Sequence, residues 1–212
     1  MTQGPKDWLD RVYRSKSVAE LEDSYDGWAP GYEADLLAAG YRLPAIAAGL
    51  AGRYLSLDTT PILDAGCGTG FIGEALAVLG YQGLEGLDLS EGMLEVARSK
   101  SVYGVLHHGR LGAALDLPDS RFGAVLAIGV LTRGHAGAEA FDELLRVTRP
   151  GSQMIFSIRV DSAVGAPYLE RMARFEGDGR WHPVAATDAF ASMPFGEPEV
   201  RHQVFVYRIA DA

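Results

Sequence analysis

The 212-residue sequence is poor in cysteine, in positive charge and in long apolar runs. Its one cysteine, Cys67, excludes an intramolecular disulfide framework and a zinc site built from several cysteines. Lys and Arg number 19 against 28 Asp and Glu, a formal net charge of −9, so we expect no nucleic-acid partner, which would need a basic face. Apolar runs are interrupted within about ten residues, too soon to cross a bilayer. Residues 1–14 lack the apolar core of a secretory signal, and we expect a cytoplasmic protein without a membrane partner.

The composition and length of the sequence are those of one globular domain. Hydrophobic residues make up 48% of the chain and charged residues 22%, which is enough apolar surface to offset chain entropy. The length suits a single domain. The 26 glycines are more than the usual share and direct attention to loops that turn tightly around a ligand.

The apolar pattern changes along the chain. It has helical spacing from Val18 to Tyr32, with a break near Pro30-Gly31, and again over 43–55. Short apolar runs alternating with amphipathic helices follow, and two extended segments close the chain. Strands are expected at 61–65, 84–89, 103–107, 122–130, 154–160, 183–190 and 200–209. This alternation predicts an α/β fold: a three-layer, doubly wound, Rossmann-like sheet of seven strands, mostly parallel, with an antiparallel last strand.

The most informative segment is 62–70, Ile-Leu-Asp-Ala-Gly-Cys-Gly-Thr-Gly, in which a strand runs into glycines and then into a helix. Glycine lets the backbone turn sharply and approach a ligand without a Cβ in the way. Such a ligand sits beyond the carboxyl ends of the strands. Asp88 ends the next strand, where a carboxylate can accept hydrogen bonds from both ribose hydroxyls. Asp64 suits a cationic amino-acid group and would repel a pyrophosphate.

A dinucleotide is the competing ligand for this loop. Residues 68–73 formally match the pattern G-x-G-x-x-G. The register is poor, because the strand ends at Ala65 and the third glycine position, counted from Gly66, falls on Phe71. The chain also has no Tyr-x-x-x-Lys pair. A nicotinamide-dependent oxidoreductase is therefore the weaker alternative.

Residues 64–70 resemble the first motif of class I S-adenosylmethionine (SAM)-dependent methyltransferases. Residues 87–94, Leu-Asp-Leu-Ser-Glu-Gly-Met-Leu, resemble the second strand of that family and its helix. Residues 144–151, Leu-Leu-Arg-Val-Thr-Arg-Pro-Gly, resemble its lead into the fifth strand. The likeness covers residues from about 20 to 160 in the right order and at the right spacing.

A narrower likeness lies in three further segments. Residues 25–32 (Tyr-Asp-Gly-Trp-Ala-Pro-Gly-Tyr), 40–42 (Gly-Tyr-Arg) and 129–135 (Gly-Val-Leu-Thr-Arg-Gly-His) resemble the Williams–Beuren-region methyltransferase-like group. The resemblance implies an N-terminal helical lid over 1–55, part of the same domain as a SAM-binding core over 56–212. It also implies S-adenosyl-L-methionine as the cofactor and S-adenosyl-L-homocysteine (SAH) as its product.

The resemblance assigns roles to residues at matching positions. Asp64 would hold the SAM amino group, Asp88 the ribose hydroxyls, and Leu89 and Met93 would pack on the adenine. Ile128 and Gly129 would offer carbonyls near the methyl group. The expected cofactor-binding residues are Tyr25, Tyr32, Asp64, Gly66, Cys67, Gly68, Asp88, Leu89, Met93, Arg110, Leu111, Ile128 and Gly129.

One position departs from the family pattern. After the third strand such proteins usually carry an acid that accepts a hydrogen bond from the adenine amino group. Arg110 stands there and cannot accept. The N–H of Leu111 could still contact adenine, and Arg110 could stack on the ring.

Two questions about turnover follow. His135 comes after the fourth strand, where an acceptor would approach, and could be a general base; the alternative is an ordinary loop histidine. Because Arg110 replaces the acid and no other base is evident, a SAM- or SAH-binding protein without turnover is the alternative function. We expect no metal site, since the adjacent His107 and His108 point in different directions.

The residues at the end of strand four bear on the class of methyl acceptor. Strand four ends in residues 128–131, Ile-Gly-Val-Leu, rather than in the Asn/Asp-Pro-Pro-aromatic motif of enzymes that methylate base or glutamine amino groups. We expect a small-molecule acceptor, bound between the N-terminal helices and the region 160–195. The oligomeric state stays open, with a homodimer as one expectation.

Overall fold

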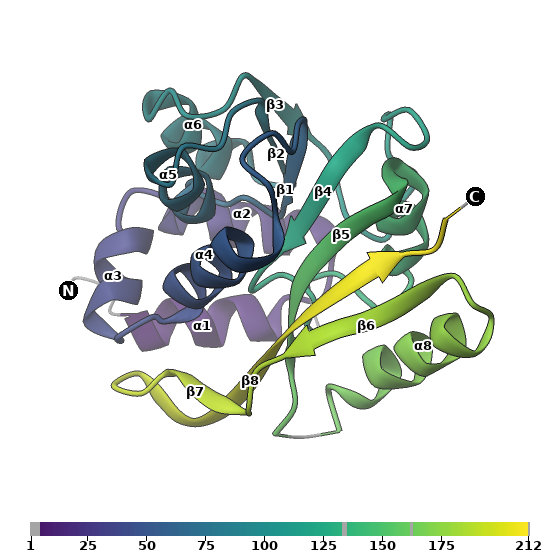
Figure 1. Ribbon diagram of the computed structural model, residues 1–212. Coiled ribbons are helices and arrows are strands. Elements are labelled where there is room, and N and C mark those ends of the chain that lie inside the picture. Colours follow the sequence, from purple (N-terminus) through teal and green to yellow (C-terminus); the bar gives the residue numbers. More distant parts are fainter. Residues whose placement is uncertain (1–4, 133–134, 162, 212) are drawn as a thin grey trace.

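The computed structural model describes residues 5–132, 135–161 and 163–211. Within them one twisted sheet runs through the molecule (Figure 1). Its strands are β1 (Ile62–Ala65), β2 (Leu84–Asp88), β3 (Val105–His108), β4 (Phe122–Ala127), β5 (Thr148–Arg159), β6 (Trp181–Ala186), β7 (Phe190–Met193) and β8 (Glu197–Ile209). The order is β3-β2-β1-β4-β5-β8-β6, with β7 paired to β8. The first five strands are parallel to one another and β8 is antiparallel to its three neighbours.

Helices cover both faces of this sheet and one end of it (Figure 1). They are α1 (Pro5–Arg14), α2 (Val18–Trp28), α3 (Tyr32–Ala38), α4 (Leu43–Tyr54), α5 (Phe71–Val78), α6 (Glu91–Ser99), α7 (Ala140–Val147) and α8 (Ala166–Gly177). Apolar side chains of α4 and α5 pack on one face of the sheet, and those of α7 and α8 pack on the other. Helices α1–α3 form a third apolar cluster around Val12, Leu21, Trp28 and Leu36, which also includes Met193 of β7. The predicted three-layer, doubly wound fold with an antiparallel last strand is confirmed.

Two details of the predicted strands differ from the structure. The sheet has eight strands among the described residues rather than seven, because the segment expected at 183–190 is divided between β6 and β7. Thr187 lies between β6 and β7. Its N–H donates to the Val204 carbonyl and its hydroxyl oxygen accepts from the Val204 N–H, so this segment remains hydrogen-bonded to β8. Helix α7 ends at Val147, and β5 begins at the next residue, Thr148, rather than at the expected Met154. The alternation of apolar residues in the sequence shows neither the division between β6 and β7 nor the early start of β5.

Local signals in the sequence explain where the site-bearing helices start. Ser90 caps α6 by accepting a hydrogen bond from the Met93 N–H at 3.1 Å, as its residue type predicts. Gly70 precedes α5 in the left-handed conformation, with φ of 93°. Both caps follow directly after parallel strands, so the two helices begin at the same edge of the sheet. None of the helices in the described part of the chain has the length and apolar character needed to cross a membrane.

A cluster of aromatic rings fixes the face of the sheet beneath α7 and α8. Trp181 is 0% exposed and stacks on Phe156 with ring centroids 5.6 Å apart. Its indole N–H donates to the Met172 carbonyl of α8 at 3.2 Å. Phe141 of α7 meets the same tryptophan edge to face at 5.2 Å. One side chain therefore joins both helices to the sheet.

We predict that Trp181→Ala lowers the free energy of unfolding by about 3–5 kcal/mol, because truncating a buried tryptophan leaves a cavity. Urea unfolding of the two proteins measures the difference. Phe195→Ala is the matched control: Phe195 is 80% exposed, and its loss should change stability by less than about 0.5 kcal/mol. Equal effects of the two substitutions would contradict the central role of Trp181.

Candidate functional site

The glycine-rich loop after β1 is held in one tight conformation. The N–H groups of Gly66 and Cys67 both donate to the Leu87 carbonyl of β2, at 2.7 and 3.0 Å. Gly66 has φ of +81°, and a Cβ on it would lie 2.6 Å from the nearest atom of Val130. A side chain at this position would thus meet both backbone strain and a clash. The sequence uses glycine here because the loop passes directly beneath the residues that follow β4.

Asp88 ties this loop to the next helix. Its Oδ2 accepts from the Gly68 N–H at 2.8 Å and its Oδ1 accepts from the Ser90 N–H at 3.0 Å. Burial raises the pKa of Asp88, and the two amide hydrogen bonds oppose that rise. Each carboxylate oxygen has a further lone pair with which to accept a hydrogen bond. Asp88 is therefore a fixed acceptor at the end of β2.

Asp64 is the second carboxylate at this edge, 2% exposed at the end of β1. Its Oδ2 accepts from the Tyr103 hydroxyl at 2.6 Å, and that hydroxyl accepts from the Gly73 N–H at 3.2 Å. Burial raises the pKa of Asp64 to about 7, although the hydrogen bond from Tyr103 acts in the opposite direction. Within the described residues its Oδ1 is buried without a hydrogen-bond partner. A buried oxygen without a hydrogen-bond partner costs folding free energy. A cationic donor group of a ligand would supply the missing hydrogen bond.

Two adjoining cavities open between these strands, and we call them together the loop cavity. Their volumes are about 50 and 20 Å³. The described residues that line them are Tyr25, Tyr32, Gly66, Gly68, Leu87, Asp88, Leu89, Met93, Gly109, Arg110, Leu111, Ile128, Gly129, Val130, His135 and Ala136. The structure thus brings together all the predicted site residues except Asp64 and Cys67, which do not line the cavities. Arg133 and Gly134 of the predicted motif lie outside the described residues.

Cys67 faces the sheet rather than the loop cavity. A Cβ on Gly86 of β2 would lie 2.9 Å from the Cys67 sulfur. The thiol is 5% exposed, and burial raises its pKa, so it stays protonated and is a poor nucleophile.

Helices α2 and α3 close over the loop cavity. The Tyr25 hydroxyl of α2 forms a hydrogen bond with His135 Nε2, which joins this helix to the segment after β4. Tyr32 of α3 packs edge to face on Trp28, with ring centroids 4.7 Å apart. Lys100 of the segment after α6 pairs with both Glu33 of α3 and Glu74 of α5. The aromatic residues at helical spacing therefore cover the site and also pack with one another.

Two functional positions were not expected from the sequence. Asp26 Oδ1 accepts from the Ser90 hydroxyl at 2.5 Å and from the Gly92 N–H at 2.9 Å, so it holds α2 on the first turn of α6. Tyr103 is the partner of Asp64 described above. Asp26 lies inside the motif at 25–32, and its acidic side chain was the available signal. No local pattern shows that Tyr103 would reach Asp64.

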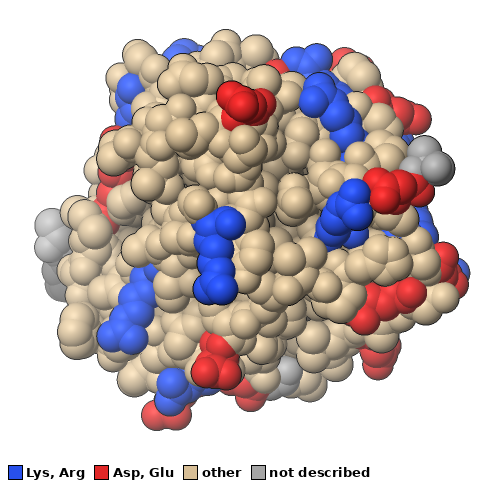
Figure 2. Space-filling model, in the orientation of Figure 1, with Lys and Arg blue, Asp and Glu red and all other residues tan. Residues whose placement is uncertain are grey.

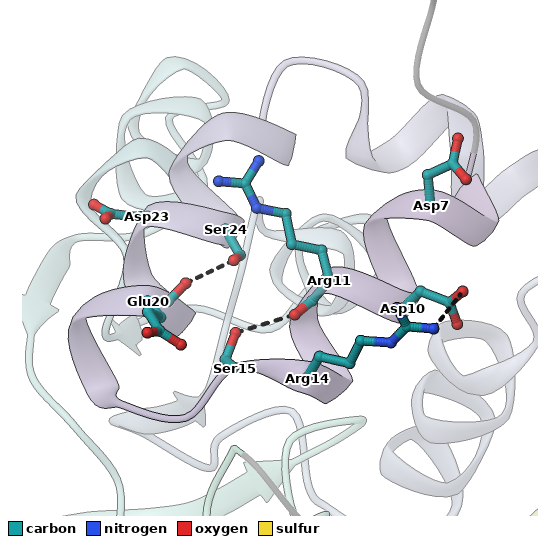
Figure 3. Close-up of a pocket in the computed structure, with 8 residues that line it drawn as sticks. All are labelled: Asp7, Asp10, Arg11, Arg14, Ser15, Glu20, Asp23 and Ser24. Atoms are coloured by element: carbon teal, nitrogen blue, oxygen red, sulfur yellow. Dashed lines mark hydrogen bonds and ion pairs between the residues drawn. The ribbon is translucent and has the colours of Figure 1, made fainter.

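Three other hollows surround this site. A cavity of about 60 Å³ adjoins Gly129 and His135 on the side of β7 and β8, and an open cleft of about 810 Å³ lies beside Arg110 and α8. A depression of about 520 Å³ lies between α1 and α2 (Figure 3). Its Arg14 pairs with Asp10 at 3.7 Å, and it shares no residue with the loop cavity. In the part of the chain that the structure describes, no group of three His, Cys, Asp or Glu side chains could hold a metal ion.

Comparison with known proteins identifies this arrangement. A sequence profile of the methyltransferase domain matches residues 63–156. Human methyltransferase-like protein 27 is 35% identical over 186 residues, which cover 83% of this chain and 75% of that protein. Malonyl-acyl-carrier protein O-methyltransferase of Serratia marcescens is 38% identical over 110 residues, 51% of this chain and 42% of that one.

Solved structures agree on the fold. The crystal structure of SpnF, a 4+2 cyclase, superposes with a TM-score of 0.72 at 16% identity and covers 93% of this chain and 98% of that one. The likeness at this identity concerns the fold alone. The profile and the human relative, whose match extends over most of the chain, confirm the predicted family and its cofactor. The chain belongs to the class I SAM-dependent methyltransferases.

Proposed function

We propose that the loop cavity holds SAM and that the protein transfers its methyl group to a small molecule. The observation that carries the proposal is the placement of two carboxylates at neighbouring strand ends, on either side of the glycine-rich loop. Asp64 has a buried oxygen without a hydrogen-bond partner in the described structure, which suits the SAM amino group. Asp88 is fixed by two backbone N–H groups and suits the ribose hydroxyls.

The remaining contacts follow from the lining of the loop cavity. Leu89 and Met93 supply apolar surface for the adenine, beside the bend of Gly66 and Gly68. Arg110 and Leu111 line the smaller part of the cavity, Leu111 buried and Arg110 exposed. Arg110 forms no ion pair with any described residue, so its guanidinium can lie over the adenine face in place of the usual acid.

The N-terminal helices act as a lid in this proposal. The loop cavity holds far less than the roughly 300 Å³ at which ligand sites begin. Tyr25 and Tyr32 occupy the remaining space, so α2 and α3 must withdraw before the cofactor enters. The Tyr25–His135 and Asp26–Ser90 hydrogen bonds are the contacts that such a movement breaks. We therefore keep residues 1–55 as the lid of a single domain whose core is 56–212.

His135 is the proposed general base. When bound, SAM supplies a methyl group on a positively charged sulfur, which is already activated for displacement. The chain has to orient the acceptor, exclude water and remove a proton. His135 lines the loop cavity beside Gly129, and Tyr25 fixes the orientation of its ring. Its imidazole would accept the proton of a hydroxyl or amine acceptor and pass it to solvent through the open cleft, which His135 also lines.

Several features favour a small acceptor. The cavities next to Gly129 are small and enclosed by the lid. The net charge is −9, and on the side of the molecule drawn in Figure 2 Lys and Arg are interspersed with Asp and Glu and form no broad basic patch. A nucleic-acid partner would need such a patch. The matched relatives include two O-methyltransferases of small or carrier-bound compounds by name, in agreement with an oxygen acceptor.

We predict that Asp88→Asn weakens SAH binding by at least about tenfold, because it removes charge-assisted hydrogen bonds to the ribose. Isothermal titration with SAH measures the affinity. Glu91→Gln is the control, since it removes the same charge from an exposed residue three positions away and should leave the affinity unchanged. Equal affinities of wild type and Asp88→Asn would remove Asp88 from the site.

The pH dependence of SAH binding tests Asp64. Its pKa is about 7, so the side chain is neutral below this pH and a carboxylate above it. Only the carboxylate attracts an ammonium group, and we predict that SAH affinity rises with pH through about 7. Tyr103→Phe removes the hydrogen bond that lowers this pKa, so the midpoint should move to higher pH. Tyr54→Phe should leave it in place, and a pH-independent affinity would refute the assignment.

A screen for SAH formation tests turnover. Phenols, catechols, carboxylic acids and amines are offered with SAM, and at least one should be methylated. With that acceptor, His135→Gln should lower kcat about 100-fold or more, as loss of a general base does. A pH–rate profile shared by the two proteins would remove His135 as the base. SAH binding without turnover of any compound would favour a binding protein instead.

A further inference from the structure

We infer that the methyl acceptor binds in the cavity between the lid and the β7–β8 hairpin, here called the aromatic chamber, and that it is a neutral, flat compound with a hydroxyl group. The chamber has a volume of about 60 Å³. This inference rests on the proposed function, because it takes the loop cavity as the place of SAM. It adds the acceptor's position and its chemical class.

The aromatic chamber and the loop cavity share one wall. Tyr25, Tyr32, Gly129 and His135 line both of them. Gly129 has φ of +74°, and a Cβ on it would lie 2.5 Å from the Tyr41 hydroxyl oxygen. The backbone of Gly129 is thus the boundary between the two cavities, with no room for a side chain. A group in the chamber therefore lies next to the end of β4, where the resemblance places the methyl group.

The other walls of the chamber are mostly rings. Tyr13, Trp28 and Tyr41 line it together with the two tyrosines of the lid. Tyr25 stacks on Trp28 with centroids 6.3 Å apart, and meets Tyr32 edge to face at 6.4 Å. Rings held in these orientations offer faces and edges to another flat ring. The small volume admits a single ring only as the lid adjusts around it.

Two polar atoms of the β7–β8 hairpin are buried without partners in the described structure. They are Ser192 Oγ, in a residue that is 0% exposed, and His202 Nδ1. Both residues line the aromatic chamber. Buried polar atoms are nearly always hydrogen-bonded, because leaving them unpaired costs free energy. A ligand hydroxyl can donate to one of them and accept from the other.

The charges around the chamber favour a neutral ligand. Burial, together with nearby Arg159, lowers the pKa of His202 to about 4, so the imidazole is neutral at pH 7. Arg159 is paired with Asp161 through two hydrogen bonds, at 2.8 and 2.9 Å. Tyr13 donates to Glu197 at 3.1 Å. An ionised acceptor would lose its hydration here, and the charged side chain among the described lining residues, Arg159, already has its partner.

The open cleft beside α8 is the rival site, and its chemistry is different. It carries the exposed cations Lys16 and Arg110, which suit an anion. It adjoins Leu111, on the adenine side of the loop cavity, and Gly129 does not line it. A ligand in the cleft would therefore lie away from the end of β4. For this reason we assign the acceptor to the chamber and the cleft to the passage of protons.

Fluorine NMR on the whole protein, saturated with SAH, tests the inference. Three single-ring compounds that differ in the group para to the fluorine are compared: para-fluorophenol, para-fluorobenzoate and para-fluorobenzylamine. We expect the phenol to bind and the two ions to bind at least about tenfold more weakly. Ser192→Ala and His202→Leu should each weaken phenol binding about tenfold, since each removes one hydrogen-bond partner. The matched controls Ser56→Ala and His182→Leu change exposed residues and should bind the phenol as the wild type does.

The outcomes distinguish a wrong acceptor site from a wrong SAM site. SAH affinity of all four variants should equal that of the wild type, which also shows that they fold. Preferential binding of the benzoate, lost in Arg110→Ala, would move the acceptor to the cleft and overturn the inference. Phenol binding unaffected by Ser192→Ala and His202→Leu would overturn it as well. Absence of SAH binding by the wild type would instead refute the proposed cofactor site.

Discussion

The carboxylate of Asp88 holds together parts of the site that are far apart in the sequence. One oxygen accepts from Gly68 in the loop after β1, and the other accepts from Ser90 at the start of α6. Ser90 in turn caps α6 and donates to Asp26 of α2. A single chain of hydrogen bonds thus runs from the glycine-rich loop to the lid. A change at any member of this chain moves both the floor and the cover of the loop cavity.

The acids of this edge are costly to ionise because they are buried. Burial raises the pKa of both Asp64 and Asp88, and the Asp88 charge raises that of Asp64 further. A cationic amino group beside Asp64 would relieve that cost. By mass action, a ligand of this kind stabilises the folded state as it binds. The site therefore contributes most to the stability of the protein when it is filled.

The sequence predicted what depends on local pattern. The strand–glycine–helix order located the loop and the acid at the end of β2, and the resemblance to the family suggested that Tyr25 and Tyr32 belong to a lid. Local pattern could not predict contacts between residues far apart in the sequence. Tyr103 and Asp64, which share a hydrogen bond, are 39 positions apart, and Asp26 and Ser90 are 64 positions apart. Nor could local pattern predict the division of the predicted strand 183–190, because the turn at Thr187 depends on hydrogen bonds to β8. The meeting of Ser192 and His202 in one cavity, on which the proposed acceptor site rests, shows only in the folded hairpin.

The β7–β8 hairpin is built onto the sheet at a distance from the cofactor residues. Among the described residues that line the loop cavity, none comes after Ala136. Ser192 and His202 can therefore be exchanged in evolution without disturbing the machinery that binds SAM. Under the proposed assignment, a change confined to this short C-terminal segment would alter the acceptor, with residues 64–70 and Asp88 left as they are. Substrate range and cofactor use are then inherited as separate traits of one domain.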